Sequence, residues 1–390
     1  MNHQLKNYCQ KIIDQIIHPP QGILRRSFIT PTGLKKDKDR QAGFYAQQYD
    51  WDLYFEGVAL NQIAPEKMPF FREALLNFLD FTTADGRTPR TISPFKFWDP
   101  GDQHKPFLIQ GCLLASQALK DFSWINQTIW NKLVAFANFW EKRQGFHGLI
   151  RWRSVLESGV DNNPTITNLP DFAAESVDAS VYFYGELLAL AKIAEKIGQD
   201  PQPWQEKANN LKQRINFIFW HAEDQIYYDI YNFSDQPVEP IKVRSWTCFT
   251  PLWLRLPSQK QAKAMIERYL LNPKEFLAPF GLRSLSRQEL LYNTAKRGLI
   301  WIHFEKRRWI VSNWQGPVWV ISNWLLTEGL INYGYRKEAQ EIRQRVLQAL
   351  EKDLKTTGTL HENYHPETGE GLWAPDFGSW NLLALNWLKN

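Results

Sequence analysis

Apolar residues recur at helical spacing along most of the chain. In the segment 107–119, for example, Leu108, Cys112, Leu113 and Leu119 fall near one face of a helix. Ser258 is placed to cap a helix start, and Gly198 to end one. The pattern as a whole predicts helices over 70–81, 107–119, 129–142, 174–197, 203–220, 258–271, 318–333, 336–355 and 377–388.

Alternating strand patterns are scarce, although 226–230 and 241–244 fit a small hairpin. We count roughly eleven or twelve helices, joined in pairs by loops that carry Trp, Pro, Gly and Asp. Six helical hairpins in a ring would form an all-α (α/α)6 toroid, a six-hairpin barrel whose long loops hold the active site. A helical solenoid competes, but no fixed repeat period is found.

The domain organisation follows from the linkers. No Pro/Ser/Gly-rich segment divides the chain, so we predict one catalytic domain over 1–390. Residues 1–40 carry no motif and are treated as an N-terminal extension that could cover the site.

Composition excludes several classes of protein. The 46 Lys and Arg only slightly exceed the 41 Asp and Glu, and acids interrupt the densest basic run at 35–40, so nucleic acid is not the expected ligand. No apolar run is long enough to span a membrane, and the start lacks a signal-peptide core. We therefore expect a cytoplasmic protein. Cys9, Cys112 and Cys248 lie far apart, which argues against a zinc site or a disulfide framework, and no cofactor is predicted.

Aromatic residues are the unusual feature. The chain has 18 Trp, 24 Phe and 14 Tyr. The flat apolar face and polar edge of Trp and Tyr match a sugar ring, but aromatic residues also fill protein cores. Their placement must therefore decide between the two interpretations.

The first aromatic cluster, 44–55, places acids and aromatic residues at a helix entry. Asp52 could accept two hydrogen bonds from neighbouring sugar hydroxyls while Trp51 or Tyr54 stacks on the ring. Alternatively, Asp50 or Asp52 caps the helix and the aromatic residues are core.

The second cluster, 97–106, again pairs Trp with Asp and adds polar side chains. Trp98 and Asp99 are its sugar-binding candidates, and Gln103 is a further polar donor. Lys105 could meet an anionic aglycone or face solvent.

The third cluster, 156–164, is a tight turn in which either Glu157 or Asp161 could be a catalytic acid, unless Asp161 only makes an Asx-turn. The fourth, 309–324, has four Trp around a Gly-Pro step. There Gly316 would let the backbone approach a ligand closely, and Pro317 suits the first position of the next helix.

The fifth cluster, 360–371, has three acids and two histidines. A metal site would use His361, Glu362 and His365, but Pro366 argues against the helix that would present them together, so we predict no metal. Two loop acids far apart in sequence and surrounded by aromatic residues fit glycoside hydrolysis, which needs a protonated carboxyl and a second carboxylate. The residues alone do not choose the pair.

Four motifs in the same order resemble the trehalase-related clan of inverting α-glycosidases, above all glycoside hydrolase family 63 and its short bacterial mannosylglycerate and glucosylglycerate hydrolases. The stretches are 49–55 (YDWDLYF), 157–164 (ESGVDNNP), 314–319 (WQGPVW) and 361–369 (HENYHPETG). The resemblance implies that Asp161 is the general acid and Glu362 the general base. The carboxyls of such an inverting pair are expected to lie roughly 6.5–9.5 Å apart.

The resemblance and the clusters together predict substrate contacts for Tyr49, Trp51, Asp52, Trp98, Asp99, Gln103, Lys105, Asn162, Trp314, Gln315, Gly316, Tyr364, Trp373 and Trp380. The sequence departs from the family pattern where Arg is usual, at Gln315 and Thr165, and where Trp is usual, at Val160. Neither Gln nor Thr can replace the forked, charged hydrogen bonds of Arg, so the contacts to sugar or aglycone should differ.

We therefore expect an inverting α-glycosidase for a small α-glucoside or α-mannoside, such as glucosylglycerate, mannosylglycerate or a related compatible solute. Lys105, Arg25 and Arg26 are possible partners of an acidic aglycone. The alternatives are a trehalase or oligosaccharide α-glucosidase, and a sugar-binding protein without turnover. The sequence does not indicate an oligomeric state.

Overall fold

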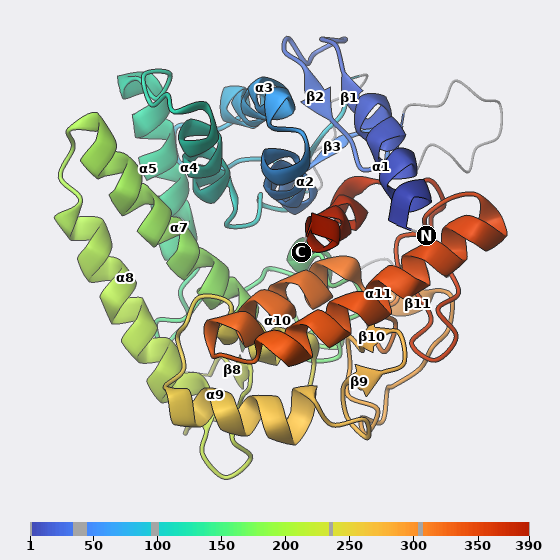
Figure 1. The fold of residues 1–390 in the computed structure, drawn as a ribbon. Coiled ribbons are helices and arrows are strands. Elements are labelled where there is room, and N and C mark those ends of the chain that lie inside the picture. Colours follow the sequence, from blue (N-terminus) through green and yellow to red (C-terminus); the bar gives the residue numbers. More distant parts are fainter. Residues whose placement is uncertain (1, 34–44, 95–100, 234–236, 303–306, 390) are drawn as a thin grey trace. The chain divides into compact units, whose positions relative to one another are not determined.

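The computed structural model describes residues 2–33, 45–94, 101–233, 237–302 and 307–389 (Figure 1). Helices dominate these residues, and the strands among them pair only two at a time. None of these helices is long and apolar enough to cross a membrane. The chain forms two compact units: unit 1 is Met1–Lys142, Tyr182–Asn210 and Ala374–Asn390, and unit 2 is Arg143–Val181 and Leu211–Trp373. The single domain over 1–390 stays a prediction.

Unit 1 begins with helix α1 (Asn2–Ile16). Strand β1 (Ile17–His18) pairs with β2 (Phe28–Ile29), and β3 (Gln48–Tyr49) pairs with β4 (Thr91–Ile92). Its other elements are α2 (Asp50–Ile63), the 3-10 turn η1 (Pro65–Lys67), α3 (Met68–Asp80), α4 (Leu108–Leu119), α5 (Gln127–Glu141) and the C-terminal 3-10 segment η5 (Ser379–Lys389). Helices α7 (Val177–Ile197) and α8 (Gln202–Arg214) contribute residues to both units.

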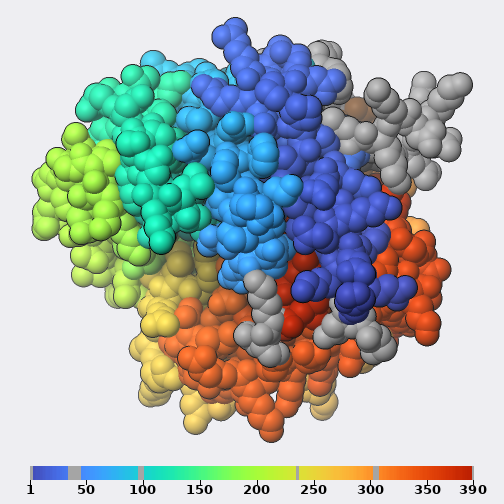
Figure 2. Space-filling model, turned by 45° about the horizontal axis from the view of Figure 1, so that its top comes forward, coloured from blue at the N-terminus to red at the C-terminus, as the bar shows by residue number. Residues whose placement is uncertain are grey.

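The core of unit 1 forms around α2. This helix packs against α3, α4 and η5, so the two ends of the chain meet within this unit (Figure 1). The rings of Trp51 and Trp380 lie edge to face there, with 5.9 Å between their centroids. The α1–β2 segment covers part of the same unit beside α3 (Figure 2).

Unit 2 holds shorter elements before its two long helices. They are α6 (Val155–Ser158), β5 (Ala174–Glu175), the π-helical turn η2 (Ile215–Phe219), β6 (Trp220–His221), β7 (Ile226–Tyr227), β8 (Ile230–Tyr231), the 3-10 helix η3 (Trp246–Leu252), α9 (Gln259–Met265), the π-helical turn η4 (Ile266–Leu270), β9 (Leu277–Ala278), β10 (Gly281–Leu282), β11 (Gly298–Ile302), β12 (Arg307–Val311), α10 (Val320–Asn332) and α11 (Arg336–Thr357). The antiparallel pairs are β5–β8, β6–β7, β9–β10 and β11–β12. Helices α10 and α11 pack side by side (Figure 1).

Most predicted helices are confirmed, with shifted ends. Segments 70–81, 107–119 and 129–142 correspond to α3, α4 and α5, and Ser258 caps α9 in a full capping box with Gln261. Segment 203–220 is helical to Phe219, as α8 followed directly by the π-helical turn η2. Two predictions were wrong in part, because residues 174–175 form a strand and 377–388 is largely 3-10 helix.

The structure also corrects the start of α10 and the predicted hairpin. Val318 exchanges backbone hydrogen bonds with Tyr364, at 2.8 and 2.9 Å, so α10 begins only at Val320 and Pro317 is not its first residue. Strand β7 pairs with β6, and 241–244 is not a strand. The sequence prediction missed α1 and the β11–β12 hairpin, the longest strand pair in the described chain.

Candidate active site

Asp161 lies in a loop that follows the one-turn helix α6. Ser154 caps this helix by accepting a hydrogen bond from the Glu157 amide at 3.2 Å, and Gly159 ends it with a left-handed φ of 76°. The Asx-turn expected at the acid is instead made by Asn163, whose side chain accepts from the Thr165 amide at 3.2 Å. The Asp161 side chain is thereby left half-buried at the turn.

Glu362 lies in an extended segment and is buried, with 3% of its surface exposed. Its amide donates to the carbonyl of Trp373 at 2.9 Å, and the nearby Tyr364 is bonded on both sides to Val318. Backbone bonds to two separate segments therefore hold the backbone at Glu362 in place.

Ser312 brings the two acids together. Its amide donates to Oδ2 of Asp161 at 3.4 Å, and its hydroxyl donates to Oε2 of Glu362 at 3.0 Å. A residue that bonds both carboxyls keeps them within about 10 Å of each other, given ordinary serine dimensions. This limit is compatible with an inverting pair, which needs room for a water molecule.

A side-chain network holds the Asp161 loop against the Trp314 segment. Asn162 accepts from the Trp314 amide at 2.6 Å and donates to the side chain of Asn313 at 3.1 Å. The Gln315 side chain donates to the Asn162 carbonyl at 2.9 Å and accepts from Asn293 at 3.1 Å. The predicted site residues Asn162, Trp314 and Gln315 thus come together beside Asp161.

Several predicted contacts in unit 2 are buried supports of these loops. The Trp314 ring stacks on Trp319 with 3.6 Å between centroids, and Tyr364 is fully buried. At Gly316 the close approach is to protein, since a Cβ there would lie 2.1 Å from the Asn293 carbonyl oxygen. Direct substrate contact by these three residues stays a prediction.

Trp373 is half-buried, and an arginine cation stacks on its ring. The Arg297 guanidinium lies 3.5 Å from the centre of the Trp373 ring, while the Trp373 carbonyl receives the Glu362 amide. The Arg297 side chain is exposed, and no described residue forms an ion pair or hydrogen bond with its guanidinium. This cation was missed in the sequence. The only sequence signal for Arg297 was its position among basic and apolar residues shortly before the Trp-rich cluster 309–324.

Glu157, the other candidate acid, is fully buried and already engaged. It accepts from the Arg153 amide at 2.6 Å and pairs with Arg143 at 3.4 Å. In the fifth cluster, His361 bonds Asp353 at 2.8 Å and His365 accepts from backbone amides. The described residues contain no group of three potential metal ligands.

The remaining predicted residues lie in unit 1. Lys105 is buried and bonds both carboxylate oxygens of Asp50 at 3.1 Å, with its ammonium 5.0 Å from the Trp51 ring. The solvent-facing alternative for Lys105 was therefore wrong, and contact with an acidic aglycone would require this pair to open. Neither Asp50 nor Asp52 caps α2, because the N-cap residue of this helix is Tyr49.

Asp52 is buried and accepts from the Ser379 hydroxyl at 2.8 Å. Burial raises its pKa to about 7 despite this bond. Gln103 is occupied by backbone groups, since it accepts from the Thr88 amide at 3.0 Å and donates to the Gly86 carbonyl at 3.3 Å.

The other unit 1 candidates differ in their surroundings. Tyr49 is half-buried, and its hydroxyl accepts from Gln47 at 2.8 Å. Trp51 and Trp380 are buried against each other, which is the arrangement expected of aromatic residues in a core. Trp98 and Asp99 lie outside the described residues.

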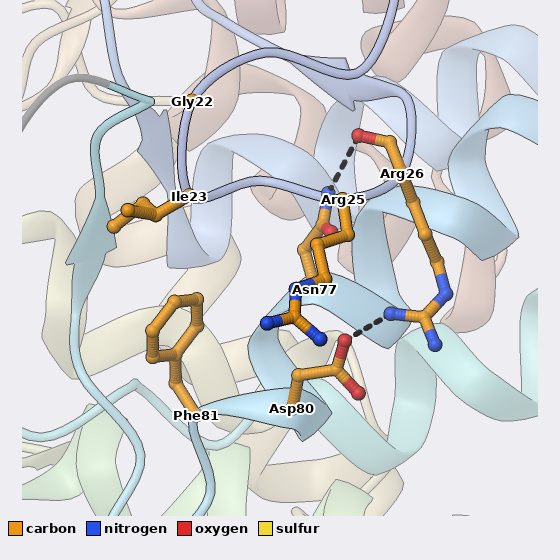
Figure 3. Close-up of a pocket in the computed structure, with 7 residues that line it drawn as sticks. All are labelled: Gly22, Ile23, Arg25, Arg26, Asn77, Asp80 and Phe81. Carbon is orange, nitrogen blue, oxygen red and sulfur yellow. Dashed lines mark hydrogen bonds and ion pairs between the residues drawn. The ribbon is translucent and has the colours of Figure 1, made fainter.

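Arg25 and Arg26 lie at a pocket of unit 1 lined by Gly22, Ile23, Arg25, Arg26, Asn77, Asp80 and Phe81 (Figure 3). Arg26 forms an ion pair with Asp80, so its charge is already matched. Asn77 holds the Arg26 carbonyl at 3.3 Å. A role for either arginine with an acidic aglycone stays a prediction.

The chain is similar to several known proteins. The family model described as a mannosylglycerate hydrolase MGH1-like glycoside hydrolase domain matches residues 45–380. A probable mannosyl-oligosaccharide glucosidase of Schizosaccharomyces pombe is 26% identical over 60% of this chain and 30% of its own length. The mannosylglycerate hydrolase of Rubrobacter radiotolerans is 26% identical over 50% of this chain and 39% of its own. The chain thus spans about a third of the length of these curated relatives.

Among solved structures, the GH63 mannosylglycerate hydrolase of Thermus thermophilus in complex with glucose superposes with a TM-score of 0.76. The match covers 98% of this chain and 99% of that one, at 18% identity. It confirms the predicted all-helical (α/α)6 fold class.

Proposed function

Because the chain belongs to the mannosylglycerate hydrolase MGH1-like glycoside hydrolase family, we propose that it hydrolyses a small α-glucoside or α-mannoside with inversion. Asp161 is the general acid and Glu362 the general base. The observation that carries these assignments is that Ser312 hydrogen-bonds both carboxyls. A shared hydrogen-bond partner supports treating them as a pair, although they lie in loops far apart in the sequence.

The proposed reaction is a single displacement. Asp161 gives its proton to the glycosidic oxygen as the bond from that oxygen to the anomeric carbon breaks. Glu362 removes a proton from a water molecule as the water oxygen bonds to the opposite face of the same carbon. The products are the free sugar with inverted configuration and the aglycone alcohol. Proton exchange with solvent then returns Asp161 to the acid and Glu362 to the carboxylate.

The surroundings of the two acids support this division of roles. The Ser312 hydroxyl donates to Glu362, and a donated hydrogen bond favours the ionised form that a base requires. Asp161 is half-buried on a loop, and the Ser312 amide donates to it at 3.4 Å. A loop position suits a proton donor that must reach the leaving oxygen.

We propose further that the aglycone carries a carboxylate, as glycerate does, and that Arg297 binds it. Arg297 is an exposed guanidinium held against Trp373, whose carbonyl fixes the Glu362 amide. Arginine presents a planar fork of donors that matches a carboxylate, and stacking on an aromatic ring reduces the entropy lost on binding. The name of the Rubrobacter relative, a mannosylglycerate hydrolase, supports the same substrate class.

A cytoplasmic location belongs to the same proposal. Its support is that Cys9, Cys112 and Cys248 are all buried free thiols, as expected where the surroundings are reducing.

The proposed function is tested by incubating purified protein with α-glucosyl- and α-mannosylglycerate, glucosylglycerol, trehalose, kojibiose and nigerose, with NMR to identify the anomer released. Release of a β-anomer is expected. Asp161→Ala and Glu362→Ala should each lower kcat at least ~100-fold. An α-anomer as first product would contradict the inverting mechanism. Sugar binding without turnover on any glycoside would favour the non-catalytic alternative.

The carboxylate assignment has its own test. Arg297→Ala should raise KM for the anionic glycosides at least ~10-fold and leave trehalose or glucosylglycerol turnover, where present, unchanged. Lys296→Ala removes the neighbouring exposed cation and is the matched control. Equal losses on charged and neutral substrates would contradict a carboxylate contact. Preference for trehalose over both glycerates would favour the trehalase alternative.

A further inference from the structure

We propose that Ser312 is a positioning residue of this site. It keeps Glu362 ionised and aligned with Asp161, and so links the β11–β12 hairpin to the two acids. The inference rests on the proposed function.

The first support is the geometry of the serine. Ser312 follows β12 directly, and only 6% of its surface is exposed. Its hydroxyl reaches Glu362 at 3.0 Å, while its amide reaches Asp161 at 3.4 Å. One residue thus donates to both acids through different groups, so a shift of its backbone would alter both contacts together.

The second support is the choice of acceptor. A buried serine hydroxyl often donates to a nearby backbone carbonyl. Ser322 does this with the Trp319 carbonyl at 3.0 Å, and Ser158 with that of Val155 at 2.6 Å. The Ser312 hydroxyl is instead directed at a carboxylate that is itself almost fully buried. Burial alone favours a neutral carboxyl, and the donated bond opposes that effect.

Other titratable or charged groups lie near the Glu362 segment. Asp161 lies across Ser312, and Asp353 of α11 pairs with His361, the residue before Glu362. Arg297 lies over the ring of Trp373, whose carbonyl accepts the Glu362 amide. The Asp353 carboxylate favours proton binding by Glu362 and the Arg297 cation opposes it, whereas Asp161, protonated as the general acid, adds no charge. Neighbouring groups therefore shift the protonation of Glu362 in opposite directions, and the neutral Ser312 hydroxyl adds to the effects that favour the ionised form.

The third support is the tight packing at the root of the hairpin. Gly298 of β11 pairs with Val311, which precedes Ser312. A Cβ at Gly298 would lie 2.4 Å from the side-chain nitrogen Nδ2 of Asn162 and 2.9 Å from the backbone carbonyl oxygen of Ser312. The hairpin root, the Asp161 loop and Ser312 are therefore packed closely together, which restricts the position of the serine relative to both acids.

The test uses the full chain with Ser312→Ala, Ser312→Thr and Ser312→Cys. In Ser312→Ala, the acid limb of the pH–kcat profile should move up by about 1 pH unit, because a hydrogen bond to a charged group is lost. The plateau kcat should fall about 10-fold while KM changes little. Ser312→Thr keeps the hydroxyl and should restore both, and Ser312→Cys, a weaker donor, should lie between. Ser322→Ala is the matched control, a buried serine bonded to a carbonyl.

A second readout does not depend on turnover. The Glu362 carboxyl, labelled with ¹³C and assigned by its loss in Glu362→Gln, is titrated by NMR in the wild type and in Ser312→Ala. A higher midpoint in the variant supports the proposal even if no tested glycoside is hydrolysed, so failure of the proposed function would be seen separately. An unchanged midpoint, or an unchanged acid limb in an active Ser312→Ala, would overturn it.

Discussion

The side-chain amide of Gln315 donates a hydrogen bond to the backbone carbonyl of Asn162 at 2.9 Å. Asn162 directly follows Asp161, and it also accepts the amide of Trp314 at 2.6 Å. Gln315, where the family resemblance led us to expect Arg, therefore ties the Trp-rich segment to the loop of Asp161, the proposed general acid. A neutral amide is sufficient for this bond because its acceptor is a backbone carbonyl.

Gln315→Ala should loosen the Asp161 loop. We expect kcat to fall about 10-fold and the free energy of unfolding to fall by about 1 kcal/mol, the usual contribution of one hydrogen bond. Steady-state kinetics and urea unfolding measure the two effects. Gln288→Ala is the control, because Gln288 bonds the Lys274 carbonyl at 3.0 Å on the exposed surface. Equal kcat losses in both variants would contradict the role given to Gln315.

Glu157→Gln separates the two candidate acids of the third cluster. Glu157 is paired with Arg143 at 3.4 Å, so the variant should lower the free energy of unfolding by about 3 kcal/mol. The kcat of the folded variant should stay within ~10-fold of wild type, whereas Asp161→Asn should lose at least ~100-fold. Chemical denaturation and kinetics at a temperature where both variants are folded provide the comparison. The reverse order of kcat values would transfer the acid role to Glu157.

Gly298→Ala should damage the site by steric contact alone. The new methyl would press on Asn162 and on the Ser312 carbonyl, so we expect kcat to fall at least ~10-fold while most secondary structure remains. Kinetics together with far-UV circular dichroism test this expectation. In the control Gly33→Ala, the added carbon would meet nothing closer than 3.4 Å and should change neither quantity. Wild-type kcat in Gly298→Ala would show that the hairpin root can adjust.

A pH effect on stability is expected from Asp178, which is buried beside Asp229. Burial, reinforced by the Asp229 charge, raises the Asp178 pKa from 3.8 to about 7. Between these two values the folded chain keeps a proton that the unfolded chain loses. Asp178 therefore lowers the free energy of unfolding as pH rises from about 4 to about 7.

Asp178→Asn should remove that dependence. Its oxygen can still accept the Trp152 indole N–H, which Asp178 binds at 2.8 Å, while the amide cannot ionise. We expect the free energy of unfolding of the variant to exceed that of wild type by up to about 4 kcal/mol at pH 8 and by much less at pH 4. Urea unfolding at the two pH values measures the difference. An unchanged slope with pH would assign the effect to another group.

Local sequence determined most of the helices and the positions of the loops that carry the two proposed catalytic acids. The segment 107–119 became α4 because its apolar residues recur at helical spacing, and Ser258 caps α9 because a serine hydroxyl satisfies free amides at a helix start. Asp161 and Glu362 could be placed in loops of recognisable composition. These features depend on residues a few positions apart, and such patterns can be read along the chain.

The tertiary structure decided what those loops contact. Ser312 reaches acids 151 and 50 residues away, and α10 starts late because Val318 pairs with Tyr364. Lys105 is buried because Asp50, 55 residues earlier, matches its charge. Strand pairing and buried ion pairs depend on partners that are distant in the sequence and are brought close by the fold. A charged side chain such as Lys105 can be buried only where a partner compensates its charge, and otherwise it stays in water. No local pattern in the sequence specifies that partner.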